Sequence, residues 1–170
     1  MLKNKRCLVL ASGFYEWEKK DGKKIPHYIR IKDKKIIVYA GLWDEWEDKE
    51  TGEKIRSCTI ITCPANKFMS KLHDRMPVIL KEKDFNTWLT SDDFKEIRGL
   101  LLPYKDSLMI EHEVSIDVNN PRNNKKELLD TVSVNPLGGI NLNPDLLDLQ
   151  IKRDGRGVPL PVREQPIESM

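Results

Sequence analysis

The chain has 170 residues and a formal net charge of +2, with 39% hydrophobic and 33% charged residues. This length suits one domain with a sizeable core and is too short for two ordinary domains. The net charge is too small for the whole molecule to attract nucleic acid electrostatically. Binding to nucleic acid would therefore need a local basic patch. The apolar runs are too short for a membrane span or a secretory signal, and we expect a cytoplasmic protein with no membrane partner.

The first part of the chain is typical of β structure. β-branched and aromatic runs, separated by turn residues, predict strands at 7–17, 27–31, 36–43 and 56–63. The run at 36–43 is almost continuously apolar, which predicts a central strand covered on both faces. The dipeptides Asp21-Gly22 and Thr51-Gly52 are expected at turn tips.

The periodicity then changes. Phe68, Met69 and Leu72 stand at helical spacing and predict a helix over 64–72, followed by a short strand at 77–80.

Two further helices are expected at 82–90 and 91–104, the second with Ser91 as its N-cap. A strand at 107–115 follows. The whole pattern predicts an α+β, β-rich fold with a mixed or antiparallel sheet and a few short helices.

The composition changes near Asn135, where prolines and glycines become frequent. We therefore divide the chain into a domain at 1–134 and a C-terminal extension at 135–170. Residues 138–170 are expected to dock loosely or to stay disordered.

The three cysteines do not build a disulfide framework and fit a reducing compartment. Cys58 and Cys63 are five positions apart in one predicted strand, so their side chains would point to opposite faces and not share a metal. His27, His73 and His112 have no ligand spacing with them. The sequence predicts no metal and no other cofactor.

A carboxylate stands among aromatic residues in SGFYEW, at 12–17. Regular strand alternation would place Glu16 on the face of Phe14 and opposite to Trp17. A partly desolvated carboxylate beside a ring has a raised pKa, as an acid–base catalyst needs. The alternative is a rim carboxylate paired with Lys19 or Arg6.

The sequence HDRMP, at 73–77, falls in a predicted helix-to-strand turn. The imidazole of His73 is the kind of group that exchanges a proton near neutral pH, and Arg75 carries a planar cation suited to phosphate. Turns on a rigid scaffold often present functional side chains. The alternative is an exposed turn in which Asp74 pairs with Arg75 or a nearby lysine.

In this order, RCLVLASGFYEW, KIPHYI, YAGLWDEW, CTIITCPAN, LHDRMPVIL and VSIDVNNPRN resemble the SRAP family of SOS-response-associated peptidase proteins. The match runs from about Arg6 to Asn124, and the ordered set GFYEW, AGLW and HDRMP is highly specific. The resemblance implies a DNA-damage-response protein with a compact β-rich fold that binds single-stranded DNA. It also implies covalent capture of abasic sites by an N-terminal cysteine, whose amine and thiol close on the sugar aldehyde as a thiazolidine.

The same resemblance implies residue roles. Glu16 matches the family's acid–base glutamate, and His73 matches the histidine that helps to open the sugar ring and later assists reversal. Arg75 would support the site or face phosphate, while Trp17 or Trp43 would stack on bases. Core packing is the alternative for the tryptophans, and we favour it for Trp43 because its strand is predicted to be central.

The chain departs from the family pattern at its start. Family members begin Met-Cys-Gly-Arg and carry roughly eighty further residues, including an NARSE-like segment, before the strand that matches residue 7 onward. Here position 2 is Leu, and Cys7 matches the strand cysteine rather than the nucleophile. We expect either a fragment, whose N-terminal half is missing or encoded separately, or a degenerate relative that keeps some DNA affinity without the chemistry.

Two other functions stay open at this point. A cysteine peptidase-like hydrolase would pair Cys63 or Cys58 with His73, although both thiols lie among isoleucines, where cysteine is usually inert. A non-catalytic remnant would show no salt-sensitive binding to abasic or intact single strands.

Overall fold

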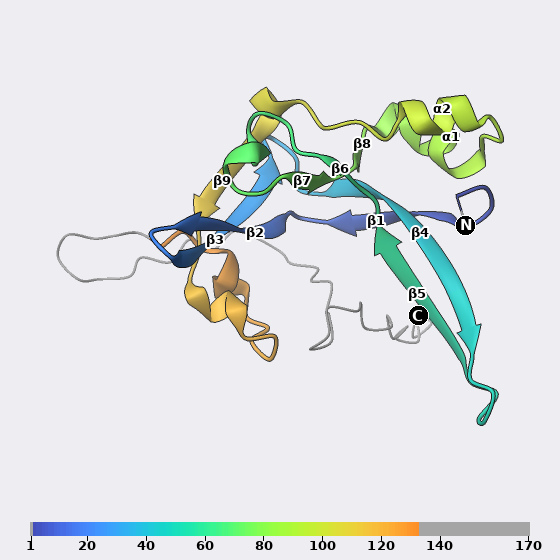
Figure 1. The fold of residues 1–170 in the computed structure, drawn as a ribbon, viewed down its shortest axis with the longest axis horizontal. Helices are drawn as coiled ribbons and strands as arrows, with labels where there is room; N and C mark the ends of the chain where they lie inside the picture. Colours follow the sequence, from blue (N-terminus) through green and yellow to red (C-terminus); the bar gives the residue numbers. More distant parts are fainter. Residues whose placement is uncertain (1, 133–170) are drawn as a thin grey trace, which may run out of the picture.

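Strands dominate the computed structural model, which describes residues 2–132 (Figure 1). Within this range the strands form three antiparallel sheets, joined by short helices. The predicted β-rich α+β class is confirmed. The predicted domain boundary at 134 and the extension at 135–170 lie outside the described residues.

The first sheet is built on one long strand. β4 (Ile37–Glu47) pairs with β1 (Arg6–Ala11) on one side, and with β8 (Ile79–Leu80) and then β5 (Lys54–Ile60) on the other. The β4 residues from Ile37 to Gly41 are mostly buried, which confirms the predicted central strand. Beyond them β4 and β5 continue as a hairpin that extends away from the rest of the molecule (Figure 1).

The second sheet has the order β2 (Phe14–Lys20), β3 (Lys23–Ile31) and β9 (Met109–Glu113). Asp21 and Gly22 form its first turn with φ values of 50° and 74°. Positive φ at both central residues is the requirement of a type I′ hairpin, so the predicted turn tip is confirmed. The third sheet pairs β6 (Thr62–Pro64) with β7 (Arg75–Pro77).

Two predicted strands are broken, and each break moves the chain to another sheet. The run at 7–17 divides at Ser12 and Gly13, where a Cβ on Gly13 would lie 2.4 Å from the Ile29 carbonyl oxygen. The run at 56–63 divides at Ile61. Cys58 therefore lies in the first sheet and Cys63 in the third.

The predicted helix at 64–72 is wrong, because only the 3-10 turn η1 (Met69–Lys71) forms there. Pro64 is the last residue of β6 instead of a first helical residue. Asn66 accepts the Met69 N–H at 2.8 Å through Oδ1 and donates to the Tyr104 carbonyl at 2.7 Å. These side-chain bonds replace the helical ladder.

The two later helices are shorter than predicted. The turn η2 (Glu82–Asp84) leads into α1 (Phe85–Thr90), and α2 (Phe94–Gly99) follows. Asp93, not Ser91, is the N-cap of α2, since its side chain accepts the Lys95 N–H at 2.7 Å. The remaining turns are η3 (Asp106–Leu108), η4 (Ile116–Asn119) and η5 (Lys126–Leu129). Within residues 2–132, the helices are too short to span a bilayer.

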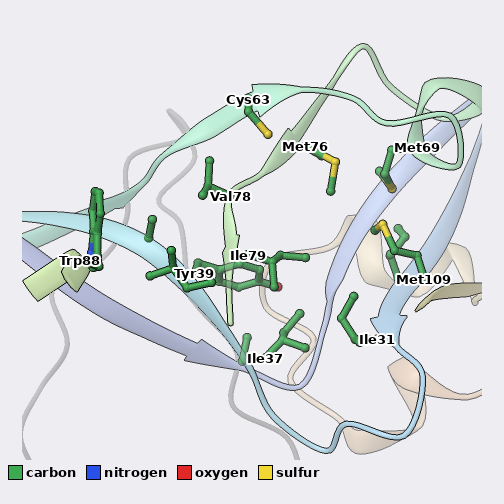
Figure 2. Packing of buried hydrophobic residues seen from close by; sticks show 14 of the residues in the cluster. Ile31, Ile37, Tyr39, Cys63, Met69, Met76, Val78, Ile79, Trp88 and Met109 are labelled. Atoms are coloured by element: carbon green, nitrogen blue, oxygen red, sulfur yellow. The ribbon is translucent and has the colours of Figure 1, made fainter. Parts of the chain in front are cut away.

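The main core lies between the first and third sheets, α1 and the inner end of the second sheet (Figure 2). Trp88 of α1 is fully buried and donates its indole N–H to the Cys7 carbonyl at 2.9 Å. Met69 and Met109 point toward one another and join η1 to β9 (Figure 2). This packing fixes the segment before His73 against the second sheet.

Candidate functional site

Glu16 is half-buried in β2, on the face of the second sheet that carries Phe14. The register pairs Phe14 with Ile29 and Glu16 with His27, and residues directly opposite in antiparallel strands share a face. The predicted common face of Glu16 and Phe14 is confirmed. Trp17 points to the other face, where its Nε1–H donates to Asn119 Oδ1 at 2.7 Å.

His73 lies in the turn between η1 and β7, with its backbone N–H bonded to the Met69 carbonyl at 2.9 Å. Its Nδ1 atom accepts the Arg75 backbone N–H at 3.0 Å and also lies 3.0 Å from Asp74 Oδ1. Nδ1 cannot both accept the Arg75 N–H and donate a proton to Asp74. The Asp74 side chain is 88% exposed and bonds readily to water, so we assign the neutral ring the Arg75 bond and a proton on Nε2.

Arg75 is exposed in β7 but its guanidinium is held in place. Nε donates to Thr62 Oγ1 at 2.9 Å, and Nη2 donates to the Thr62 carbonyl and to Oγ1, both at 2.7 Å. The register pairs Arg75 with Pro64, so β6 supplies these contacts. A guanidinium anchored through Nε and Nη2 points its remaining edge in a fixed direction, which suits phosphate recognition.

A pocket of about 100 Å³ lies where the second sheet meets the segment before His73. Its lining residues come from β2, β3, β9 and the η1 region: Glu18, His27, Glu111, Phe68, Lys71 and Leu72. Glu16 stands opposite His27 in the register, and His73 directly follows Leu72. The strand of Glu16 and the residue before His73 thus line the same pocket, although neither Glu16 nor His73 is among its lining residues.

Trp43 lies away from this pocket, in the outer half of β4. Its side chain is 37% exposed, and Lys5 Nζ lies 5.4 Å from its ring centroid as a cation–π contact. The core packing that we favoured for Trp43 is therefore wrong. The strand is central, but residues beyond Leu42 extend past the elements that cover its first half.

The family model for SOS response associated peptidase (SRAP) matches residues 1–121. The chain belongs to the SRAP family. Among its relatives, the abasic site processing protein YoaM of Bacillus subtilis is 44% identical over 134 residues, and the abasic site processing protein HMCES of Xenopus tropicalis is 38% identical over 155. The matches cover 76% of this chain in both cases, but only 58% of YoaM and 44% of HMCES.

Crystal structures show the same SRAP fold. A protein from Bacteroides thetaiotaomicron is 33% identical with a TM-score of 0.72, and the match covers 76% of this chain and 58% of that protein. A protein from Bordetella bronchiseptica is 30% identical with a TM-score of 0.62, over 68% of this chain and 57% of that protein. This SRAP chain thus spans about half of the length of the relatives that it matches, from 44% to 58% of the four described here.

Two cysteines of this SRAP chain, Cys7 and Cys63, are not presented as nucleophiles. Burial raises the pKa of the Cys7 thiol to about 11, and Cys58 contributes in the same direction. Burial also raises the pKa of the Cys63 thiol, which is 3% exposed within the core. A thiol that stays protonated in apolar surroundings is a poor nucleophile.

Sequence reasoning missed the charged residues around the pocket. The sequence patterns point to His27 only as a possible metal ligand, and they do not point to Glu18 or Glu111. The signal was present in EWE at 16–18 and EHE at 111–113, because alternation puts both glutamates of each triplet on one face. Only the register of β2, β3 and β9 shows that the two pairs flank the same histidine.

Proposed function

We propose that this SRAP chain processes abasic sites in single-stranded DNA, with Glu16 and His73 as its acid–base residues. One observation carries the proposal: β2, which holds Glu16, and Leu72, which directly precedes His73, line the same pocket. The relatives YoaM and HMCES, which are abasic site processing proteins, support the choice of substrate.

The chemistry follows from the substrate. A ring-opened abasic sugar exposes an aldehyde, and a neutral amine adds to it and expels water to give an imine. A neighbouring thiol then adds across the imine, so that an aldehyde and an aminothiol give a thiazolidine and one water. Glu16 would move protons at the amine and the leaving hydroxyl, while the Nε2–H of His73 would protonate the ring oxygen of the sugar.

The aminothiol comes from outside residues 1–170 in this proposal. Leu2 occupies the second position, and the nitrogen of Cys7 is part of a peptide bond. A separately encoded N-terminal section that begins with Met-Cys would supply the nucleophile once its methionine has been removed by hydrolysis, and it would act as a partner. The described chain would then contribute the acid–base residues and part of the DNA surface.

The DNA backbone would follow the segment around His73. Lys67, Lys71 and Arg75 are all exposed in this segment. The facing strands β2 and β9 present carboxylates instead, which repel phosphate. Phosphates would therefore meet the basic segment, and the abasic sugar would approach the pocket.

Binding to single strands tests this proposal. Fluorescence anisotropy at several salt concentrations should show tighter binding to an oligonucleotide with one abasic site than to its intact counterpart, with affinity falling as salt rises. Arg75→Ala should reduce the slope of log K against log salt by about 0.7, the value for one lost phosphate contact on a single strand.

Arg56→Ala is the matched control, because Arg56 is an exposed arginine of β5, in a different sheet from Arg75. It should leave both the slope and the preference for the abasic strand unchanged. Binding that is insensitive to salt, and equal for the two strands, would contradict the proposal and favour the non-catalytic remnant.

A further inference from the structure

His27 is a histidine almost enclosed by protein in the middle strand of the second sheet. The residue is 9% exposed. Its Nδ1 atom lies 2.7 Å from Glu111 Oε2 on β9, and its Nε2 atom lies 3.5 Å from Glu18 Oε2 on β2. Both ring nitrogens thus face carboxylates, which come from the strands on either side of β3.

The contacts with Glu111 and Glu18 favour the protonated, positively charged form of the His27 imidazole. A neutral imidazole has one N–H, and the short contact assigns it to Nδ1 as donor to Glu111. Nε2 is buried and has no hydrogen-bond partner among the described residues. As a bare lone pair it would face the Glu18 oxygen and be repelled. A second proton on Nε2 turns that repulsion into attraction.

Glu16 lies within reach of this charge. It stands directly opposite His27 on β2, and Glu113 stands opposite on β9, so both share the His27 face with Glu18 and Glu111. Four carboxylates on one face repel one another when they are ionised. A cation at His27 has the opposite effect, because it stabilises each ionised carboxylate. Lys71, in the pocket lining, is a further cation facing the group, and Lys20 and Lys23 lie on the same sheet face.

We propose that His27 is a positioning residue that, as an imidazolium held by Glu18 and Glu111, keeps Glu16 ionised and ready to accept a proton. This assignment rests on the proposed function, in which Glu16 exchanges protons with the substrate. The sequence places the cation on the strand next to the acid–base residue, so its effect on Glu16 depends on the β2–β3 register.

Nuclear magnetic resonance on the full chain tests the proposal without DNA. At pH 6 the imidazole nitrogens of His27 should both show the shifts of protonated nitrogen. In His27→Gln the Glu16 side-chain carboxyl signal should titrate at a pH higher by about one unit, the scale expected for a lost opposite charge nearby. His112→Gln is the matched control, because His112 lies on the other face and contacts the Leu129 carbonyl.

A second variant guards against misfolding of His27→Gln. His27→Lys keeps a positive charge and should return the Glu16 titration toward that of the wild type. A neutral His27 ring at pH 6, an unchanged Glu16 titration in folded His27→Gln, or a His27 signal that shifts only when Zn²⁺ is added would each overturn the proposal. Loss of abasic-strand preference with these titrations intact would count against the proposed function alone.

Discussion

Glu16 and His73 are accessible enough to exchange protons, and their side chains contribute little to the stability of the fold. Glu16 is half-buried on a sheet face, and His73 is 49% exposed in a turn. Their side chains therefore contribute little to the core, and their replacement should leave the free energy of unfolding within about 1 kcal/mol of wild type.

The catalytic roles predict a much larger effect on chemistry. When the chain is joined to an N-terminal section that begins with Met-Cys, Glu16→Gln and His73→Ala should each slow covalent capture of abasic DNA by about a hundredfold or more. A gel assay of the cross-linked product measures this rate. Glu82→Gln, an exposed glutamate of η2, should react like wild type. Wild-type rates in both site variants would show that the roles are wrong.

The Cys7 thiol gives a pH prediction at the same scale. Its pKa rises in the folded chain from 9.0 to about 11, mainly through burial. A raised folded pKa means that the neutral thiol contributes its full stability below about pH 9 and loses it as the pH rises toward 11. In a variant that keeps only Cys7, alkylation by iodoacetamide at pH 8 should be at least about tenfold slower than in the urea-unfolded chain.

That measurement also separates two functions. Rapid alkylation of any cysteine at neutral pH in the folded chain would favour the cysteine hydrolase over the acid–base site. Slow alkylation throughout agrees with thiols that act as small apolar side chains.

Among the elements, the break between β1 and β2 decides which sheet receives Glu16. The chain leaves the first sheet at Gly13, where any Cβ would meet the Ile29 carbonyl at 2.4 Å and the Tyr28 ring at 2.6 Å. A backbone carbonyl in a paired strand cannot move aside easily. Gly13→Ala should lower the free energy of unfolding by about 2 kcal/mol or more through this overlap.

Gly99 supplies the control for that prediction. It is the last residue of α2, and a Cβ there would meet nothing within 4 Å. Gly99→Ala should therefore be neutral or stabilise the chain by up to about 1 kcal/mol, since alanine favours helix. Urea denaturation of the two variants measures both effects. Equal stabilities would mean that the Gly13 contact relaxes.

The elements that could be predicted from sequence depend on local signals. Alternation and turn residues identified the strands and the Asp21-Gly22 hairpin, because both act within a few residues. The two breaks differ in their local signal: the apolar pattern continues through Ile61, whereas Ser12-Gly13 is a turn-favouring dipeptide that the prediction of one strand overlooked. They exist because the chain changes sheets, which depends on distant partners.

The candidate site also has features that could be predicted from the sequence and features that could not. The common face of Glu16 and Phe14 follows from alternation along one strand. The surroundings of His27 could not be predicted from alternation along one strand. Glu111 is 84 positions away from His27 and is brought near only by the β3–β9 register. Long-range register is the information that a single sequence lacks.

At the scale of the whole molecule, one buried cation joins the start of the chain to its helices. Arg6 is 8% exposed and stacks on Trp88 at 5.9 Å. Its guanidinium donates to the carbonyls of Trp88 and Ser91, at the end of α1, and to those of Leu2 and Lys3. These bonds satisfy helix carbonyls that would otherwise lose water. Arg6 is therefore part of the scaffold and not a partner of Glu16.

The outward-reaching β4–β5 hairpin has a consequence for the behaviour of the protein at high concentration. β5 pairs only with β4 among the described strands, so within residues 2–132 its outer margin of backbone donors and acceptors makes no strand pairing. Beside this margin, Glu45 of β4 binds Lys54 at 3.2 Å and Arg56 at 2.9 Å on β5. Stacking a second molecule here would strip water from this charged triplet, and that desolvation cost opposes the growth of fibrils.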